Sequence, residues 1–581
     1  MRSYHISVIL LAVFVKTTVR KRGDKTYTYL SLVEAVRVDG KMTHKTLLRL
    51  GEVSELRDSG QLDRIIGALR GHADKTWVAA EDAEAAGAPG YGAMAAAQAY
   101  FARLDAEAFF AALGARRGAE HLEDTVFVLL ANRLIRPWSK RRTILSWLGS
   151  DVAVPPGVAV PSLAQCYRAI DALFEAKEAV EPHLYNRLTN LTNLDLRLAL
   201  YDVTSTYFET DERSSSRFPS RAFGYSRDHR SDCPQVVIGL LVTGDGIPIA
   251  HHVFAGNTAD VTTLSAVMTD YQARFGVGRI ALVADRGLIS EDNVAEVAEA
   301  GFDHVLATRL HNDSEVKAVL EAAKSVDLAW VELADLHCSA AEVVIEDRRF
   351  VVVHSPQRQV RDDARHEELM AKAEEKLIAL AERVRAGRLV EAARIGAAAD
   401  RILRDCGVGR CFTTSIRDGL FHWDYDQAAY AYDTDLLAGR YVIATSLGPE
   451  QASTADVVRH YRALQRVERR FRVLKDFLGL RPVYHFTEGA VRGHIALCVL
   501  GAVIEAGMAK DLAAAGVMDP DLADQVISPR RALAELDRIR QVSLDVQGRS
   551  IKVITRRTAL QAKILTALGV NTASWDKADI A

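Results

Sequence analysis

The sequence predicts a mixed α/β fold built on a central sheet. Residues 196–256 contain three successive apolar strand patterns, and Asp245-Gly246 between the last two is typical of a tight hairpin turn. Residues 262–310 then alternate helix, strand, helix and strand patterns, with Ser290 as the N-cap of the second helix. Antiparallel strands followed by alternating helices and strands indicate a mixed sheet flanked by helices.

Length and composition limit the number of structural units and the class of protein. The chain has 581 residues, enough for about three to five structural units. Its 26% charged and 49% hydrophobic residues exclude a wholly disordered chain. The net charge is -3, so any DNA-binding surface requires clustered basic residues. Six irregularly spaced cysteines exclude a disulfide framework, and a reducing compartment fits them.

We expect residues 1–78 to form a small basic β unit and residues 79–94, rich in Ala, Gly and Pro, to form a linker. Asp39-Gly40 is a hairpin signal in the β unit. The nine lysines and arginines between residues 16 and 49 fit either a nucleic-acid surface or a solvated basic face. The apolar run at residues 6–15 is too short for a membrane span, which needs ~18 residues. We interpret it as a buried strand, or as the result of a start codon assigned too far upstream, in preference to a secretory signal.

Residues 95–194 have helical periodicity. Two of these helices, joined by a turn, fit either a helix-turn-helix DNA reader or a structural scaffold. The basic residues that they carry are Arg133, Arg136, Lys140, Arg141 and Arg142.

The central sheet is expected in two segments, residues 195–319 and 440–510. Between them, residues 320–439 form an insertion with a hairpin, a long amphipathic helix and further strand-like sequence. Residues 511–581 are expected to be mainly helical, with one hairpin near residues 546–553.

Three acidic residues lie at the ends of predicted core elements. Asp202 interrupts one apolar strand, Asp285 ends another, and Glu468 lies on a helix. Burial disfavours an ionised carboxylate, and three converging carboxylates repel one another unless a cation lies between them. Hard oxygen ligands favour Mg²⁺ or Mn²⁺, and two such ions can align the attacking and leaving oxygens of a phosphodiester. Each acid taken singly also fits a capped or salt-bridged structural role.

The helix around Glu468 is strongly basic. Glu468 is the single acid among seven lysines and arginines between residues 459 and 475. Tyr461, Glu468 and Lys475 are seven residues apart, and seven residues differ from two turns by only ~20°, so a continuous helix places all three on one stripe. A solvated basic face is the ordinary interpretation. Interleaved apolar residues, however, can dock the helix on a core and leave its other side to bind phosphates and metal.

Five motifs together resemble a known family. They are YDVTSTYFE around Asp202, GYSRDHRSDCPQ at residues 224–235, GNTAD at residues 256–260, VADRGL around Asp285, and YRALQRVERRFRVLK at residues 461–475. In this order they resemble the catalytic domain of bacterial insertion-sequence transposases of the DDE class. Within that class they are similar to the IS-four superfamily with its Tyr-Arg-Glu-Lys signature. The resemblance covers about residues 195–505.

The resemblance implies an RNase H-like core in which Asp202, Asp285 and Glu468 are catalytic and bind two Mg²⁺ or Mn²⁺ ions. The implied reaction is hydrolysis at a transposon end, followed by attack of the freed 3′-hydroxyl on target DNA. The implied partners are double-stranded DNA, as inverted-repeat ends and target, and a second copy of the chain in a synaptic homodimer, with no membrane. The implied location is the bacterial cytoplasm, at the nucleoid.

The resemblance also implies residues that contact DNA. Tyr461 and Lys475 match signature residues that grip DNA near the scissile phosphate, but the signature arginine falls on Leu464. We therefore expect DNA contacts from other basic residues of the motifs: Arg462, Arg466, Arg472, Arg227 and Arg230.

Two alternative functions remain open from the sequence. One is a metal-dependent nuclease on the same fold that cleaves without joining strands. The other is a DNA-binding domesticated transposase whose triad is vestigial. Cys406 and Cys411 lack a second ligand pair, so we interpret them as structural or free thiols and not as a zinc site.

Overall fold

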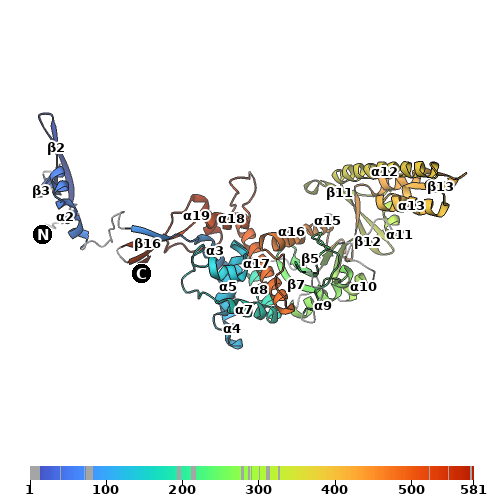
Figure 1. Cartoon of the computed structure of the whole chain (residues 1–581), viewed down its shortest axis with the longest axis horizontal. Helices are drawn as coiled ribbons and strands as arrows, with labels where there is room; N and C mark the ends of the chain where they lie inside the picture. The colour runs from blue at the N-terminus through green and yellow to red at the C-terminus, as the bar shows by residue number, and fades with distance from the viewer. Residues whose placement is uncertain are drawn as a thin grey trace, which may run out of the picture. The chain divides into compact units, whose positions relative to one another are not determined.

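The structure is a computed structural model that divides into two compact units (Figure 1). The smaller contains Met1–Ala86, Leu544–Ile551 and Ile580–Ala581, and the larger contains Gly87–Ser543 and Lys552–Asp579. The residues described are 13–38, 41–70, 72, 83–192, 198–210, 218–275, 281–285, 288, 291–299, 301–308, 314–324, 328–522, 524–546, 549–575 and 579–580.

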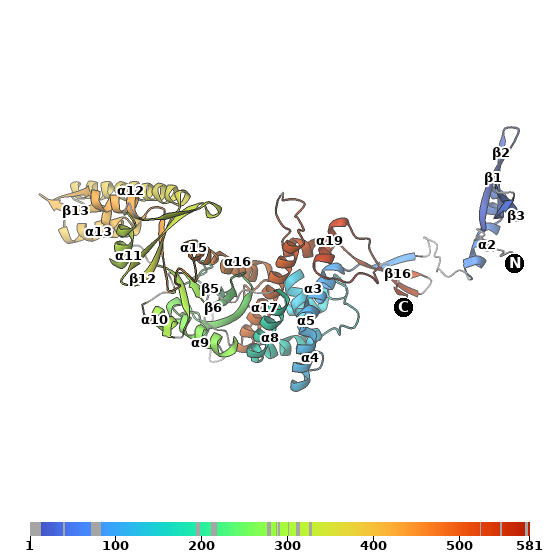
Figure 2. The same ribbon diagram turned by 180° about the vertical axis from the view of Figure 1, so that it is seen from behind.

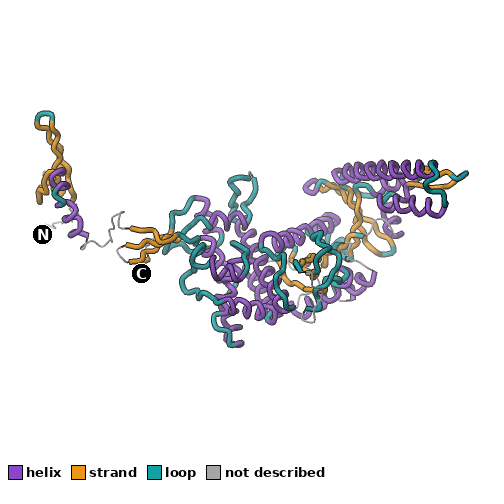
Figure 3. Tube along the Cα trace, viewed as in Figure 1, coloured by secondary structure: helices purple, strands orange, loops and turns teal. Residues whose placement is uncertain are grey.

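The smaller unit begins with a three-stranded antiparallel sheet followed by two helices (Figure 3). Its elements are β1 (Val13–Arg22), β2 (Lys25–Val38), β3 (Lys41–Glu52), α1 (Val53–Asp58) and α2 (Gln61–Arg70). The strands fall within the predicted β unit, whereas its two helices were not predicted; Asp39, Gly40 and residues 6–12 lie outside the described residues. The apolar residues that open β1 are exposed, with Phe14 at 39%, so the predicted burial of this run is wrong for the part described.

The larger unit is organised around a nine-stranded mixed sheet in the order β10-β11-β12-β15-β9-β8-β5-β6-β7. β8 pairs in parallel with β5 and β9, and the other neighbours are antiparallel. This confirms the predicted mixed α/β class. The strands are β5 (Leu198–Tyr207), β6 (Gln235–Thr243), β7 (Pro248–Ala255), β8 (Ala281–Ala284), β9 (Asp303–Ala307), β10 (Trp330–Leu333), β11 (Cys338–Ile345), β12 (Arg348–His354) and β15 (Arg440–Thr445).

The hairpin between β6 and β7 has the predicted turn. Gly246 has φ of +82°, which glycine adopts without a steric penalty, and its N–H donates to the carbonyl oxygen of Thr243 over 2.8 Å. The helices α9 (Leu264–Phe275) and α10 (Glu291–Glu299) follow the chain order predicted from the hydrophobic pattern, and α11 (Ser314–Ala322) is an additional helix after β9. Ser290, the predicted N-cap of α10, lies outside the described residues.

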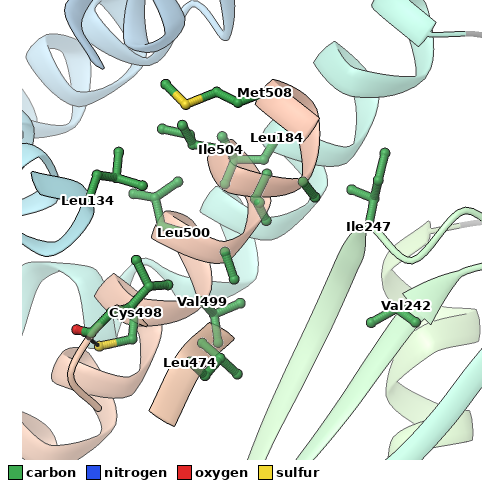
Figure 4. Packing of buried hydrophobic residues seen from close by; sticks show 14 of the residues in the cluster. Leu134, Leu184, Val242, Ile247, Leu474, Cys498, Val499, Leu500, Ile504 and Met508 are labelled. Atoms are coloured by element: carbon green, nitrogen blue, oxygen red, sulfur yellow. Dashed lines mark hydrogen bonds between the residues drawn. The ribbon is translucent and has the colours of Figure 1, made fainter. Parts of the chain in front are cut away.

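A helical region packs against the sheet through α17 (Glu488–Ala514), which is buried over most of its length. Figure 4 shows Leu500 of α17 in one hydrophobic cluster with Leu134, Leu184 and Val242 from other elements. The remaining helices of this region are α3 (Gly92–Arg103), α4 (Ala106–Arg117), α5 (Leu122–Ile135), α6 (Lys140–Arg142), η2 (Thr143–Trp147), α7 (Leu163–Glu175), α8 (Lys177–Thr192), α18 (Pro529–Leu536) and α19 (Ala559–Ala567).

Two of the five basic residues of the predicted helix-turn-helix are buried in this region. Arg133 is 6% exposed and donates to two backbone carbonyls of the loop at residues 478–479. Lys140 is 9% exposed, with its Nζ 3.0 Å from Nε2 of His485. These contacts fit the scaffold interpretation of α5 and α6. DNA contact stays a prediction for the exposed residues Arg136, Arg141 and Arg142.

Residues 355–439 follow β12 and precede β15 in the sequence. They form a separate layer with a hydrophobic cluster of its own. Figure 2 shows β12 leading from the sheet towards α12 and its neighbours α13 and β13. Strands β10 to β12, which the sequence placed in the insertion, instead belong to the nine-stranded sheet. The elements of this layer, hereafter the insertion layer, are α12 (Pro356–Arg385), α13 (Ala392–Cys406), η6 (Gly409–Cys411), β13 (Phe412–Arg417), β14 (Leu420–Tyr425), α14 (Gln427–Ala431) and η7 (Tyr432–Leu437).

The C-terminal part of the chain contains the predicted hairpin. Its strands β16 (Gln541–Val546) and β17 (Arg549–Ile554) lie in a four-stranded sheet with β4 (Ala83–Gly87) and β18 (Asp579–Ile580). All six cysteines are described; each is buried and none forms a disulfide. Within the described residues, no helix is both long and apolar enough to cross a membrane.

Candidate active site

Asp202 lies on β5, a strand in the interior of the sheet. Ala199, Tyr201 and Val203 pack in the cluster that includes α9 and α10, whereas Leu200 packs in the cluster that includes α17. Since side chains alternate along a strand, Asp202 faces the same side as Leu200. Its Oδ1 accepts a hydrogen bond from the N–H of Val203 over 2.7 Å.

Burial raises the pKa of Asp202 to about 7. The carboxylates of Asp285 and Glu468 act in the same direction, while the Val203 N–H and the Arg227 guanidinium oppose them. The electrostatics therefore couple Asp202 to both of the other acids predicted from the sequence. Their mutual repulsion is the kind that a bound cation relieves.

Asp285 follows directly after β8, next to β5. The parallel register pairs Leu198 with Ala281 and Leu200 with Val283. The same register, continued by two residues, places Asp285 beside Asp202. Adjacent strands such as β5 and β8 lie ~4.8 Å apart. Asp285 is exposed, and the hydroxyl of Tyr461 lies 3.5 Å from its Oδ1.

Glu468 is an exposed residue of α16 (Gln465–Arg472), whose buried Val467 and Phe471 attach the helix to the core. The sequence predicted one continuous helix carrying Tyr461, Glu468 and Lys475, but the structure has α15 (Thr454–Arg462), α16 and the π-helix η8 (Val473–Phe477). At the first break Leu464 N–H donates to the Tyr461 carbonyl and Arg466 N–H to the Ala463 carbonyl, a tighter i to i−3 pattern. The single-helix prediction is therefore wrong.

The three acids line one cleft of about 480 Å³. They reach it from β5, the end of β8 and α16, although they are 83 and then 183 positions apart in the sequence. Tyr461 lines the cleft as the seven-residue stripe predicts, whereas Lys475 does not. The other lining residues are Leu336, His337, Ser355, Gln357, Arg358, Arg361, Tyr441, Arg462, Leu464 and Gln465.

The donor set fits hard divalent cations, because carboxylate oxygens are the ligands that Mg²⁺ and Mn²⁺ prefer. Among the described residues, the three acids do not form a group whose oxygens all lie within 4.8 Å of one another. A single ion with bonds of ~2.1 Å holds its ligands at most ~4.2 Å apart. The three carboxylates therefore do not meet around a single ion in this arrangement, and the number of ions stays a prediction.

Comparisons with known proteins identify the family. A family model described as transposase DDE domain matches residues 197–504, just over half of the chain. The chain belongs to the DDE transposases. A second model, the N-terminal domain of IS1634 family transposases, matches residues 15–82. These matches confirm an insertion-sequence transposase of the DDE type, while the IS-four signature stays a prediction.

Other comparisons with known proteins add little. No curated protein matches this transposase. One similar solved structure is a cryo-EM structure of the piggyBac transposase synaptic complex with hairpin DNA, at 11% identity over 71% of this chain and 70% of that chain. Its TM-score is 0.32, which does not establish a common fold.

The loop at residues 224–235 holds the surroundings of the transposase's cleft together. Arg227 forms an ion pair with Asp260 of the GNTAD motif, and its backbone N–H donates to the Ser205 hydroxyl over 3.2 Å. Gly224 lies so close to the next loop that a Cβ there would overlap the carbonyl oxygen of Gly256. The motifs that identify the family therefore contact one another directly beside Asp202.

Lys475 is enclosed by the same loop. Its Nζ donates to Oδ1 of Asp228 over 2.7 Å, and Arg481 pairs with the same oxygen. The Lys475 side chain is 9% exposed and that of Asp228 is 4% exposed. Burial lowers the pKa of Lys475, although its ion pair opposes that shift. In this arrangement Lys475 holds the loop to η8.

The other predicted DNA-binding residues, with one exception, form hydrogen bonds or ion pairs within the protein. Arg462 donates to the Leu336 carbonyl over 2.6 Å, and Arg466 donates to the Gly244 carbonyl. Arg230 forms a two-point contact with Asp232 at 2.9 Å. Arg472 is exposed, and within the described part of the chain it forms no hydrogen bond or ion pair. Their roles on DNA stay predictions.

Sequence reasoning missed the contribution of the insertion layer to the cleft. Arg358 and Arg361, from the first turns of α12, line the same cleft as Glu468. The start of α12 is held in place because Ser355 N–H donates to the Gly439 carbonyl over 2.9 Å, just before β15. Pro356 at the first helical position is a start signal that locates the helix, but nothing in the sequence indicates that it meets the cleft.

Proposed function

We propose that this transposase cleaves transposon ends and joins them to target DNA by cut-and-paste transposition, with Asp202, Asp285 and Glu468 as its catalytic residues. One observation carries the proposal: carboxylates from three separate elements line a single cleft. A mixed sheet with a carboxylate on a central strand, another on its parallel neighbour and a third on a covering helix supports an RNase H-like core.

The three carboxylates would hold two Mg²⁺ or Mn²⁺ ions. When bound, such ions supply Lewis-acid activation of the attacking oxygen and charge stabilisation of the leaving oxygen. Asp202 is half-buried and fixed by the Val203 N–H, so it presents its second oxygen to the cleft in a defined direction. Tyr461 is placed to orient Asp285 through its hydroxyl.

The DNA backbone would lie between the α15–α16 wall and the start of α12. Arg358 and Arg361 supply positive charge on the α12 side, and the N-terminus of this 30-residue helix adds a favourable dipole for phosphate. On the other side we propose the motif residues Tyr461, Arg462, Arg466, Arg472, Lys475, Arg227 and Arg230 as DNA contacts. Lys475 can take this role only if DNA displaces it from Asp228.

A strand-transfer assay tests the proposal. The full chain is mixed with Mg²⁺, a labelled duplex carrying an intact transposon end, and separately a precleaved end with a free 3′-hydroxyl. We expect nicking of the first substrate and joining of the second to target DNA. Asp202→Asn, Asp285→Asn and Glu468→Gln should each abolish both steps, whereas Asp400→Asn, an exposed acid of α13, should retain them.

The alternatives give distinct results in the same assay. Cleavage without joining of the precleaved end would favour a nuclease. End binding with no Mg²⁺-dependent nicking, unchanged by Asp202→Asn, would favour a domesticated DNA-binding protein. Sedimentation of the end complex tests the proposed synaptic homodimer, which predicts two chains and two ends in one particle.

A further inference from the structure

Three side chains of different chemistry meet in the insertion layer, outside the catalytic cleft. They are His366 of α12, Cys411 at the end of η6 and Asp433 of η7. One potential ligand atom from each lies within 4.8 Å of the other two. They come from parts of the chain separated by 45 and then 22 positions, so folding of the layer is what brings them together.

The distances suit a tetrahedral transition-metal site. Cys411 Sγ lies 3.2 Å from Oδ2 of Asp433. In a tetrahedral zinc site with Zn–S of ~2.3 Å and Zn–O of ~2.0 Å, the S to O separation is ~3.5 Å. A ring nitrogen of His366 lies within 4.8 Å of both atoms, so one ion can bind all three once the side chains close around it.

The imidazole supplies the second observation that indicates a ligand. Nε2 of His366 is buried and has no hydrogen-bond partner within the described part of the chain. An imidazole nitrogen in that state is costly unless it is satisfied, and a metal ion satisfies it. The cavity of about 410 Å³ that is lined by His366 and Asp433 provides an entry path and room for a fourth ligand.

The surroundings also hold the carboxylate ligand in orientation. Arg410 pairs with Oδ1 of Asp433, which leaves Oδ2 directed at the Cys411 sulfur. Carboxylates that bind metal are usually hydrogen-bonded by a second residue, and Arg410 holds Asp433 in this way. The same arginine also approaches Oδ2 at 3.2 Å, a contact that an ion would have to displace.

We propose that His366, Cys411 and Asp433 bind one zinc ion that links α12, η6 and η7 within the insertion layer. A set of imidazole, thiolate and carboxylate ligands selects zinc over Mg²⁺, because a thiolate is too soft a ligand for the harder ion. Binding replaces the thiol proton of Cys411, which leaves to the solvent. The ion would connect α12, whose first turn lines the catalytic cleft, with η7, which leads into β15.

Cobalt substitution tests this site on the full chain. Protein stripped with a chelator is titrated with Co²⁺ in excess Mg²⁺, so that the acids of the catalytic cleft are occupied by the harder ion. We expect one Co²⁺ per chain, with the thiolate-to-cobalt absorption band and the intense visible bands of tetrahedral cobalt. Zn²⁺ should displace it.

Matched variants assign the band. Cys411→Ser should abolish it, and His366→Gln, which keeps every thiol in place, should weaken Co²⁺ binding by more than ~100-fold, since even an outer-shell change costs about 10–100-fold. Cys406→Ser, a buried cysteine of the same layer, and Asp202→Asn should leave it unchanged. Absence of a thiolate band in the parent protein, or its persistence in Cys411→Ser, would overturn the proposal. His366→Gln keeps the test decisive even if Cys411→Ser fails to fold.

Discussion

Asp202→Asn should make the metal-free protein more stable above neutral pH while it removes activity. Partial burial raises the pKa of Asp202 to about 7 from the ordinary 3.8 of an aspartate. A group whose folded-state pKa is raised stabilises the fold at low pH, and this contribution is lost as the pH rises through the folded-state value. The amide of Asn keeps an oxygen for the Val203 N–H and carries no charge at any pH, so it escapes that loss.

The magnitude follows from the size of the shift. About three pKa units at ~1.4 kcal/mol each give roughly 4 kcal/mol of stability lost by the parent protein between about pH 4 and pH 8. This value is an upper limit, because relaxation around Asp202 and water entry reduce it. The unit that contains Asp202 is large, so 1 kcal/mol corresponds to roughly 1–2 °C, and the expected gap in unfolding temperature at pH 8 is about 4–8 °C.

Thermal unfolding in EDTA from about pH 5 to pH 9 measures the gap for parent and variant. We expect the two curves to converge at the acid end and to separate through pH 7, with Asp400→Asn following the parent throughout. Added Mg²⁺ should raise the unfolding temperature of the parent and not that of Asp202→Asn, because a ligand stabilises only the state that binds it. Curves for parent and Asp202→Asn that stay parallel across the range would refute the raised pKa.

Three further substitutions test the packing and charge around the cleft. Gly224→Ala should lower the unfolding temperature, because its Cβ overlaps a backbone carbonyl oxygen. The control Gly396→Ala, at a helix-interior glycine with no atom within 4 Å, should raise the free energy of unfolding by about 0.5–1 kcal/mol, and equal effects of the two variants would contradict this. Asp228→Asn should cost roughly 3–5 kcal/mol in urea unfolding because it leaves a nearly buried lysine uncompensated, and a loss below 1 kcal/mol would contradict that pairing. Arg361→Ala should weaken binding to end DNA and reduce the slope of the log binding constant against log salt concentration by about 1. Arg365→Ala, outside the cleft, should change neither, and equal slopes for the two variants would exclude the α12 contact.

The sequence predicted the sheet best where local signals set the pairing. The β6–β7 hairpin was predictable because Asp245-Gly246 permits only a tight antiparallel turn. Strands β10 to β12 carry an equally clear hairpin pattern, yet the pattern does not say which sheet the hairpin joins. The deciding contact is between β12 and β15, where Val352 pairs with Val442, a residue about 90 positions further along the chain. Such non-local pairing is set by tertiary packing and leaves no short-range trace.

The candidate site divides in the same way. The three acids could be predicted because each breaks an otherwise apolar or basic pattern, and the motifs around them have a recognisable order. Arg358 and Arg361 could not, because on their own they are two arginines in the polar first turns of a long helix. They become cleft residues through the backbone link between Ser355 and Gly439, which ties the helix start to β15. The group of His366, Cys411 and Asp433 was missed for the same reason, since its members are too far apart in sequence to form a spacing motif.

Changes of helical pitch on either side of α16 explain why one signature residue stays at the cleft and another does not. Seven-residue spacing keeps side chains on one stripe only while the helix has a constant pitch. The tighter turn at Leu464 still leaves Tyr461 and Glu468 on the cleft, but the π-helix η8 widens the following turn and directs Lys475 to Asp228. Leu464 itself lines the cleft where the signature has an arginine, so the positive charge expected there is missing. Arginines from the start of α12 line the same cleft, and we therefore expect the insertion layer, not the α15–α16 segment, to supply that contact to DNA.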